Sequence, residues 1–118
     1  MRIGEVCLLT RDVPRLAEFY RKLLGVEPGG DREDPEHQFV LTEETALAVM
    51  WAEGPFEGRN AVLAFTVEDM DAAYARVLEL GAEIIEPPTE RPWGAVNMSF
   101  RDPDGSTVYL RKLVKEFP

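Results

Sequence analysis

The stretch PWGAVNMSFRDPDGSTVYL, residues 92–110, decides the fold because it contains two strand patterns joined by a tight turn. On both sides of the turn, apolar residues alternate with small or polar ones, as is typical of strands with one buried face. In the turn Asp102-Pro103-Asp104-Gly105, the proline fixes φ and the glycine permits a positive φ. The sequence therefore predicts two strands, at residues 95–100 and 107–110.

Upstream of this hairpin, the second half of the chain predicts a strand, a helix and another strand. Residues 61–67 are apolar and strand-like, and Asp69 is placed to cap a helix that ends at Gly81. Residues 83–86 form the next expected strand. Because successive side chains of a strand point to opposite faces, Val62 and every second residue after it should point away from the helix.

The first half of the chain repeats this order. Residues 3–10 predict a strand, and Asp12 begins a helix that ends at Gly25. Asp12 and Gly25 recur at nearly the same offset as Asp69 and Gly81, which indicates a duplicated unit. Three short strands should follow the first helix, at residues 26–28, 38–41 and 46–51.

Alternation within these elements predicts which side chains face the core. The first helix carries an apolar stripe. Its charged residues are expected on the other side: Arg15, Glu18, Arg21 and Lys22. Trp51 alternates with Leu47 and Val49 in its strand, which predicts that Trp51 faces the core.

We therefore expect one α+β domain of two tandem β-α-β-β-β modules. Module one should span residues 1–52, a linker 53–59, module two 60–112, and a short tail 113–118. A sheet with helices on one side only leaves its other side open, and two such sides joined face to face make a groove. This groove, formed within one chain or across a dimer, is the predicted site.

The composition favours a cytoplasmic protein that acts on small molecules. Thirteen Lys and Arg residues against 22 Asp and Glu give a formal net charge of -9, which repels nucleic acids and anionic membranes. The same charge would attract a cationic ligand, or simply keep the domain soluble. The single cysteine, Cys7, excludes an intrachain disulfide and fits a reducing compartment. No signal peptide or membrane-spanning stretch is expected.

The whole pattern resembles the vicinal oxygen chelate superfamily, which includes glyoxalase I, extradiol dioxygenases, fosfomycin-modifying enzymes and bleomycin-binding resistance proteins. The resemblance rests on RDVPRLAEFYRKLLGVEP at residues 11–28, FTVEDMDAAYARVLELGAEIIEPP at residues 65–88, and the stretch at residues 92–110. It implies the glyoxalase/bleomycin resistance fold, in which two β-α-β-β-β modules form a mixed sheet that bears a cleft.

The resemblance also implies four metal-ligand positions, two from each module. The metalloenzymes of the superfamily usually place His, Gln or Glu there, on the first and last strand of each module. Here the first-strand positions fall on Glu5 and Val62, and the last-strand positions fall on Tyr109 and on either Ala48 or Val49. Because one carboxylate cannot supply the several donors that a transition metal needs, we expect no metal and no cofactor.

Without a metal site, the sequence resembles the metal-free branch of the superfamily. It is nearest the bleomycin resistance proteins, which bind a compound without altering it. The expected function is metal-independent binding of a small aromatic or cationic molecule by a homodimer. The alternative is a lyase, isomerase or dioxygenase that uses Glu5 and Tyr109 as acid and base, or an unorthodox metal site. A regulatory or partner-binding module without a ligand is the third possibility.

Seven residues are candidates for contact with a ligand: Glu5, Cys7, Phe56, Val62, Trp93, Asn97 and Tyr109. A carboxylate in an apolar strand is costly to bury alone, so Glu5 either anchors the ligand or forms an ion pair. The partners available for that ion pair are Arg2, Arg101 and Arg111. Trp93 would stack on a flat or cationic ligand, or cover the core of the domain.

Tyr109 should share a face with Thr107 and Arg111, which places its hydroxyl in the groove. There the hydroxyl would act as a hydrogen-bond donor or weak acid, or the side chain would fill the space that a metal occupies in the metalloenzymes. Asn97 and Ser99 would line the neighbouring strand.

The remaining candidates have competing interpretations. Phe56 would close one end of the groove or cover the core. No histidine is placed to activate Cys7, which favours an inert thiol. His37, the only histidine, is expected at the surface rather than in catalysis.

Overall fold

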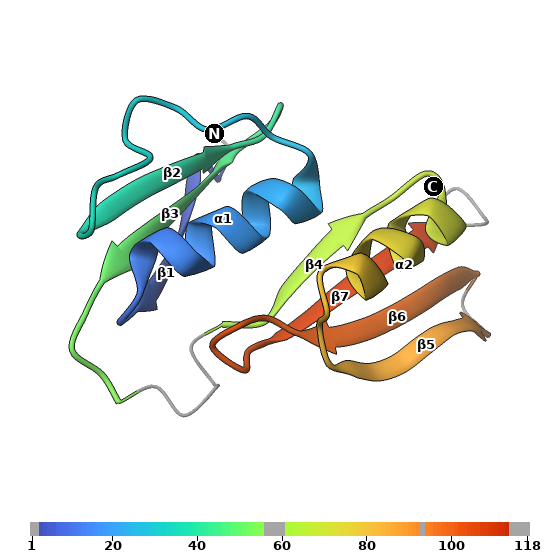
Figure 1. Cartoon of the computed structure of the whole chain (residues 1–118). Helices are drawn as coiled ribbons and strands as arrows, with labels where there is room; N and C mark the ends of the chain where they lie inside the picture. Colours follow the sequence, from blue (N-terminus) through green and yellow to red (C-terminus); the bar gives the residue numbers. More distant parts are fainter. Residues whose placement is uncertain (1–2, 56–60, 93, 114–118) are drawn as a thin grey trace. The chain divides into compact units, whose positions relative to one another are not determined.

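The computed structural model describes residues 3–55, 61–92 and 94–113. The chain divides into two compact units, Met1–Asn60 and Ala61–Pro118 (Figure 1). Each unit has one helix on a mixed β-sheet, so the chain is an α+β protein, as the sequence predicts.

The first unit is a three-stranded sheet with one helix. Its elements are β1 (Glu5–Thr10), α1 (Val13–Leu24), β2 (His37–Leu41) and β3 (Ala46–Trp51). The strand order is β1-β3-β2, in which β1 runs parallel and β2 antiparallel to β3.

The strand expected at residues 26–28 is absent, because these residues belong to the loop between α1 and β2. Pro28 cannot donate to a strand ladder, and the two glycines that follow it weaken any strand there.

Helix α1 forms because both of its ends are capped and one face is apolar. The Asp12 carboxylate accepts a hydrogen bond from the backbone N–H of Arg15 at 3.3 Å, and Gly25 ends the helix with a φ of 68°. The apolar face buries Val13, Leu16, Ala17, Tyr20 and Leu23. Arg21 is buried as well, so its expected place on the polar side is wrong. Its guanidinium is compensated by the Asp31 carboxylate, 3.5 Å away.

The second unit contains a complete β-α-β-β-β module. Its elements are β4 (Leu63–Thr66), α2 (Met70–Glu79), β5 (Ile84–Arg91), β6 (Ala95–Arg101) and β7 (Thr107–Leu113). The strand order is β4-β7-β6-β5, with β4 parallel to β7 and the other pairs antiparallel. Asp69 caps α2 by accepting from the Ala72 N–H at 3.0 Å, and Gly81 follows the helix with a φ of 72°.

The turn that joins β6 to β7 matches its prediction. The Gly105 N–H donates to the Asp102 carbonyl at 2.9 Å, and Gly105 has a φ of 87°. The buried Asp102 carboxylate also accepts from the N–H groups of Asp104 and Ser106, at 2.9 and 3.0 Å. This motif therefore stabilises the hairpin through backbone hydrogen bonds.

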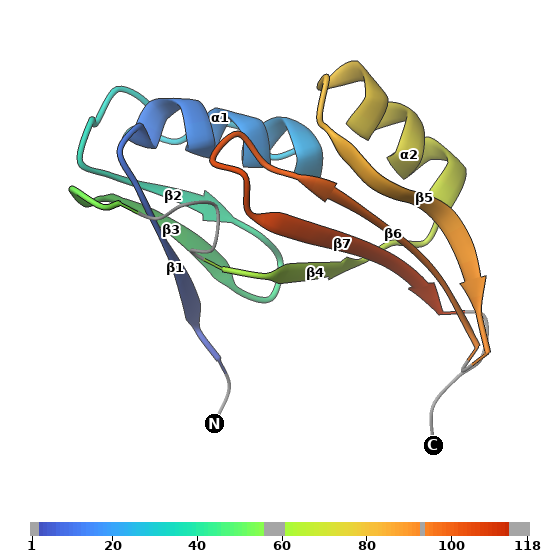
Figure 2. The same cartoon turned by 90° about the horizontal axis from the view of Figure 1, so that it is seen from below.

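In each unit the helix covers one face of its own sheet and leaves the other face uncovered by that helix (Figure 2). The helix-facing side of the first sheet buries Leu8, Val40, Leu47 and Val49, and that of the second buries Met98, Phe100, Val108 and Leu110. Trp51 keeps the expected alternation with Leu47 and Val49, but its expected burial is wrong. It is 51% exposed, because it is the last residue of β3 and the covered part of the sheet ends before it. Neither helix of the described residues has the length and apolar character needed to span a membrane.

The two cap aspartates give a direct test of the fold. We predict that Asp12→Ala and Asp69→Ala each lower the free energy of unfolding by about 1 kcal/mol, because each leaves helix N–H groups without an acceptor. Urea denaturation followed by circular dichroism measures the loss. Glu68→Ala, an exposed position next to the second cap, is the matched control and should change little. Equal effects at residues 68 and 69 would contradict the capping role.

Candidate functional site

We call the side of the β1-β3-β2 sheet that faces away from α1 the first open face. Glu5 and Cys7 lie on it, because they alternate with Val6 and Leu8, which point toward the helix. Cys7 lies beside Ala48 of β3. The exposed side chains of this face are Glu5, Cys7, Phe39, Leu41 and Met50. One carboxylate thus stands among apolar and sulfur-containing side chains.

The chemistry of Cys7 is set by its neighbours on this face. Its thiol donates to the Met50 sulfur at 3.2 Å. Partial burial and, to a smaller extent, the negative charge of Glu5 raise the pKa of the Cys7 thiol. The thiol is therefore protonated at neutral pH and is a weak nucleophile. His37 lies half-buried on β2 with its ring edge against Phe39, the ring centroids 4.5 Å apart.

The second open face is the side of the β4-β7-β6-β5 sheet that faces away from α2, and it is more polar. Tyr109 of β7 lies between Ala64 of β4 and Ser99 of β6. Its side chain is 38% exposed. The alternation of β7 places Thr107 and Arg111 on the same face, as the sequence predicts.

Arg111 and Asn97 form the polar neighbourhood of Tyr109. Arg111 lies between Thr66 and Asn97 across the sheet, and its Nε donates to the Thr66 hydroxyl at 3.0 Å. The Oδ1 atom of Asn97 is buried, and no group of the described residues donates to it. Buried acceptors are normally paired with protein, water or ligand. A water or a ligand would have to reach this buried oxygen to satisfy it.

The strand register decides which residue of β3 corresponds to Tyr109. Tyr109 lies beside Ala64, and the equivalent of Ala64 in the first unit is Cys7, which lies beside Ala48. Ala48 therefore corresponds to Tyr109, whereas Val49 is buried on the helix-facing side. In the part of the chain that the structure describes, no three His, Cys, Asp or Glu side chains gather in a metal-binding group.

Five of the seven candidate residues can be placed: Glu5 and Cys7 in the first unit, and Val62, Asn97 and Tyr109 in the second. Val62 directly precedes β4 and is 69% exposed. Phe56 and Trp93 lie outside the described residues. So the structure gathers two candidates on the first open face and Asn97 with Tyr109 on the second.

Three arginines are the possible ion-pair partners of Glu5 predicted from the sequence. Arg101 pairs with Glu83 at 3.2 Å, and Arg111 contacts Thr66, both within the second unit. Arg2 lies outside the described residues.

Phe39 and Met50 were not among the candidates predicted from the sequence. The signal that identifies them is the two-residue period of β2 and β3. Phe39 lies between Gln38 and Val40, which are both fully buried on the helix-facing side. Met50 follows Val49, which is also buried there. Strand alternation, once the register is known, therefore adds both side chains to the first open face.

Known proteins are similar to this chain over nearly its whole length. The sequence profile of the Glyoxalase/Bleomycin resistance protein/Dioxygenase superfamily matches residues 2–110. The uncharacterized protein YraH of Bacillus subtilis is 27% identical over 128 residues, which cover 97% of this chain and all of that protein. The anthracycline biosynthesis protein DauV of a Streptomyces species is 29% identical over 120 residues, but this chain spans only 43% of its length.

A solved structure supports the same conclusion about the fold. It is a glyoxalase/bleomycin resistance protein/dioxygenase family enzyme from Burkholderia phytofirmans PsJN, with a TM-score of 0.81 and 17% sequence identity. The match covers 96% of this chain and 99% of that one. With a profile match over nearly its whole length, this chain belongs to the glyoxalase/bleomycin resistance protein/dioxygenase superfamily.

Proposed function

We propose that this chain binds a small aromatic or cationic molecule on the open faces of its sheets, without a resident metal. The observation that carries the proposal is the set of side chains at the four metal-ligand positions implied by the superfamily. Glu5 supplies a carboxylate and Tyr109 a phenol, whereas Val62 and Ala48 have no donor atom in their side chains. Metal centres of this kind use three or more His, Cys or carboxylate ligands, so these residues do not fit one.

The first open face suits an aromatic or cationic compound. Phe39 and Met50 offer apolar, polarisable surface on which a flat ring can pack. Glu5 is exposed on the same face, opposite Ala46 of β3, and can pair with a positive charge on the ligand. The net charge of -9 adds a long-range attraction for cations.

The second open face supplies groups that would orient a ligand by hydrogen bonding. The Tyr109 hydroxyl can donate or accept, and the buried Oδ1 of Asn97 can accept a hydrogen bond. A few placed polar groups on an otherwise apolar surface are typical of small-molecule sites. The name of one relative, an anthracycline biosynthesis protein, agrees with a role toward a small organic compound.

In its cellular setting, we propose a cytoplasmic homodimer of the metal-free branch that binds neither nucleic acid nor membrane. The single cysteine fits a reducing compartment, and the acidic charge opposes binding to polyanions.

Binding of a cationic aromatic probe tests this function. We predict that proflavine raises the melting temperature by mass action, whereas anthracene-9-carboxylate, a flat anion, does so much less. Glu5→Gln should weaken proflavine binding by about tenfold, because it removes the carboxylate that pairs with the cation.

Isothermal titration calorimetry measures the affinities. The control is Glu43→Gln, which removes the same charge from the exposed turn between β2 and β3 and should bind as the unchanged protein does. Equal weakening in the two variants would mean that only net charge matters and would contradict a site at Glu5. A tighter complex with the anion than with proflavine would also contradict it.

The second candidate function is catalysis by a lyase, isomerase or dioxygenase that uses Glu5 and Tyr109 as acid and base or an unorthodox metal site. The exposure of both side chains favours it, since a reacting group must reach its substrate. The binding proposal predicts no turnover of the methylglyoxal–glutathione hemithioacetal, of catechols or of epoxides in spectrophotometric assays. Turnover that falls in both Glu5→Gln and Tyr109→Phe, but not in Glu43→Gln, would establish the enzyme instead.

A further inference from the structure

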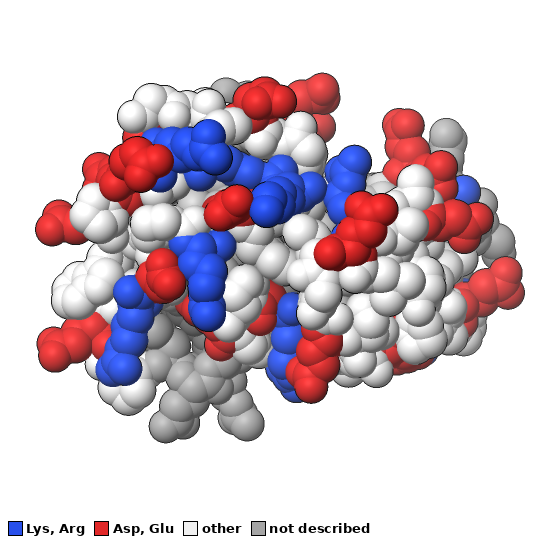
Figure 3. All heavy atoms as spheres, viewed as in Figure 1, with Lys and Arg blue, Asp and Glu red and all other residues white. Residues whose placement is uncertain are grey.

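A separate pocket of about 500 Å³ lies within the first unit, between α1 and the loop that follows it. One wall is α1, at Pro14, Glu18, Arg21 and Lys22, and the other is the loop, at residues 25–28 and 32–33. Its volume falls within the range of small-molecule sites. Basic and acidic side chains lie interspersed over α1 and the rest of the visible surface of the first unit (Figure 3). None of the residues that line this pocket belongs to the first open face.

Arg21 is a buried cation in the wall of this pocket, with an incomplete set of partners. Only 6% of the residue is exposed. One terminal nitrogen lies 3.5 Å from an Asp31 oxygen and donates to the Phe39 carbonyl at 3.3 Å. The Nε atom has no acceptor among the described residues. A buried donor without an acceptor is costly, so a water or a ligand is needed to accept from this nitrogen.

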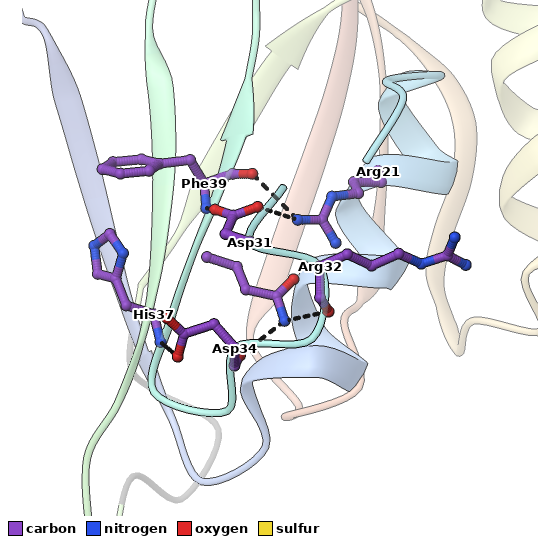
Figure 4. Close-up of polar contacts among 7 residues, drawn as sticks. Arg21, Asp31, Arg32, Asp34, His37 and Phe39 are labelled. Carbon is purple, nitrogen blue, oxygen red and sulfur yellow. Dashed lines mark hydrogen bonds and ion pairs between the residues drawn. The ribbon is translucent and has the colours of Figure 1, made fainter. Parts of the chain in front are cut away.

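The loop wall of the pocket is held in place by side chains (Figure 4). The Asp31 carboxylate, which faces Arg21, also accepts from the Phe39 N–H at 2.7 Å. The fully buried Gln38 donates to the Arg32 carbonyl at 2.8 Å. The close-up shows the guanidinium of Arg21 directed toward Asp31 and the Phe39 carbonyl. Because these hydrogen bonds already hold the loop in one conformation, ligand binding costs little conformational entropy there, which favours affinity.

The charges around the pocket are balanced rather than of one sign. Lys22 and Glu18 pair with each other at 3.1 Å on the exposed side of α1. The other charged residues of the lining come from the loop. They are one arginine, Arg32, and two glutamates, Glu27 and Glu33. The glutamates would repel a simple anion, and the arginines would repel a simple cation. A molecule that carries both charges offers an opposite charge both to an arginine and to a glutamate of the lining.

We propose that this pocket binds a small zwitterion with a carboxylate and an ammonium group, of the size of a free amino acid. The carboxylate accepts from Arg21, whose Nε lacks an acceptor, and the ammonium group lies toward Glu27 and Glu33. This site is independent of the open faces and of the function proposed for them.

The test compares three compounds of similar length: L-glutamine, which is a zwitterion, glutarate, which is a dianion, and 1,5-diaminopentane, which is a dication. Each is titrated into the full chain labelled with nitrogen-15, and amide chemical shifts are followed by NMR. L-Glutamine should shift the signals of residues 18–33 in a saturable manner, with an affinity about tenfold higher than that of either other compound. No saturable shift of these signals by L-glutamine at about 10 mM would overturn the proposal. So would equal or tighter binding of glutarate or 1,5-diaminopentane.

Two kinds of variant locate the site. Arg21→Lys keeps the buried positive charge but removes Nε, and it should abolish the L-glutamine shifts. Because Arg21 is buried and its replacement also disturbs the loop, the double variant Glu27→Gln/Glu33→Gln is the second test. Both glutamates are exposed, and the double variant should weaken L-glutamine binding by about tenfold. Glu43→Gln/Glu44→Gln, in the β2–β3 turn, is the matched control and should bind normally. Unchanged binding by the Glu27/Glu33 double variant would overturn the zwitterion assignment.

Discussion

Each sheet of this protein is buried by its own helix on one face only, and most of what the chain can do follows from that constraint. A strand points alternate side chains to opposite faces, so one register assigns every residue either to the core or to the open face. In β1 this alternation gives Leu8 to the core and leaves Cys7 and Glu5 exposed. In β7 it gives Val108 and Leu110 to the core and leaves Tyr109 exposed. Function on the open faces is thus possible without loss of the core.

Both units also bury polar atoms that the described residues do not satisfy. In the second unit the atom is Oδ1 of Asn97, an acceptor on the open face. In the first unit these atoms are Oε1 of Gln38 and Nε of Arg21, and Arg21 lies in the wall of the pocket beside α1. Native proteins rarely leave such atoms unpaired, so each marks a place where a water or a ligand completes the hydrogen bonding. The Asn97 atom is an acceptor and the Arg21 atom is a donor, and the ligands proposed for the two sites differ accordingly.

Much of the fold follows from local signals that a single sequence displays. Asp12, Asp69 and Gly25 predicted where helices begin and end, and the Asp102–Gly105 turn predicted a hairpin, because a cap or turn depends on residues close in sequence. The open-face positions of Glu5 and Tyr109 followed from strand alternation in the same way.

What the sequence did not predict depends on contacts between distant segments. Arg21 was expected among exposed charges because its partner, Asp31, lies beyond the end of the helix, in the loop. The pocket beside α1 depends on the conformation of that loop, for which strand and helix periodicity gives no information. Trp51 kept the expected alternation but lies at the last position of its strand, where alternation no longer implies burial.

The claim that the open faces bind their ligand without a resident metal is tested most directly by the metal content of the protein. The chain is purified without chelators, incubated with Zn²⁺, Mn²⁺, Ni²⁺ and Fe²⁺, freed of unbound ions by gel filtration, and measured by inductively coupled plasma mass spectrometry. Because Val62 and Ala48 supply no donor, we predict far less than one metal ion per chain, and the same amount in Glu5→Gln. One tightly bound ion per chain that is lost in Glu5→Gln would contradict the account.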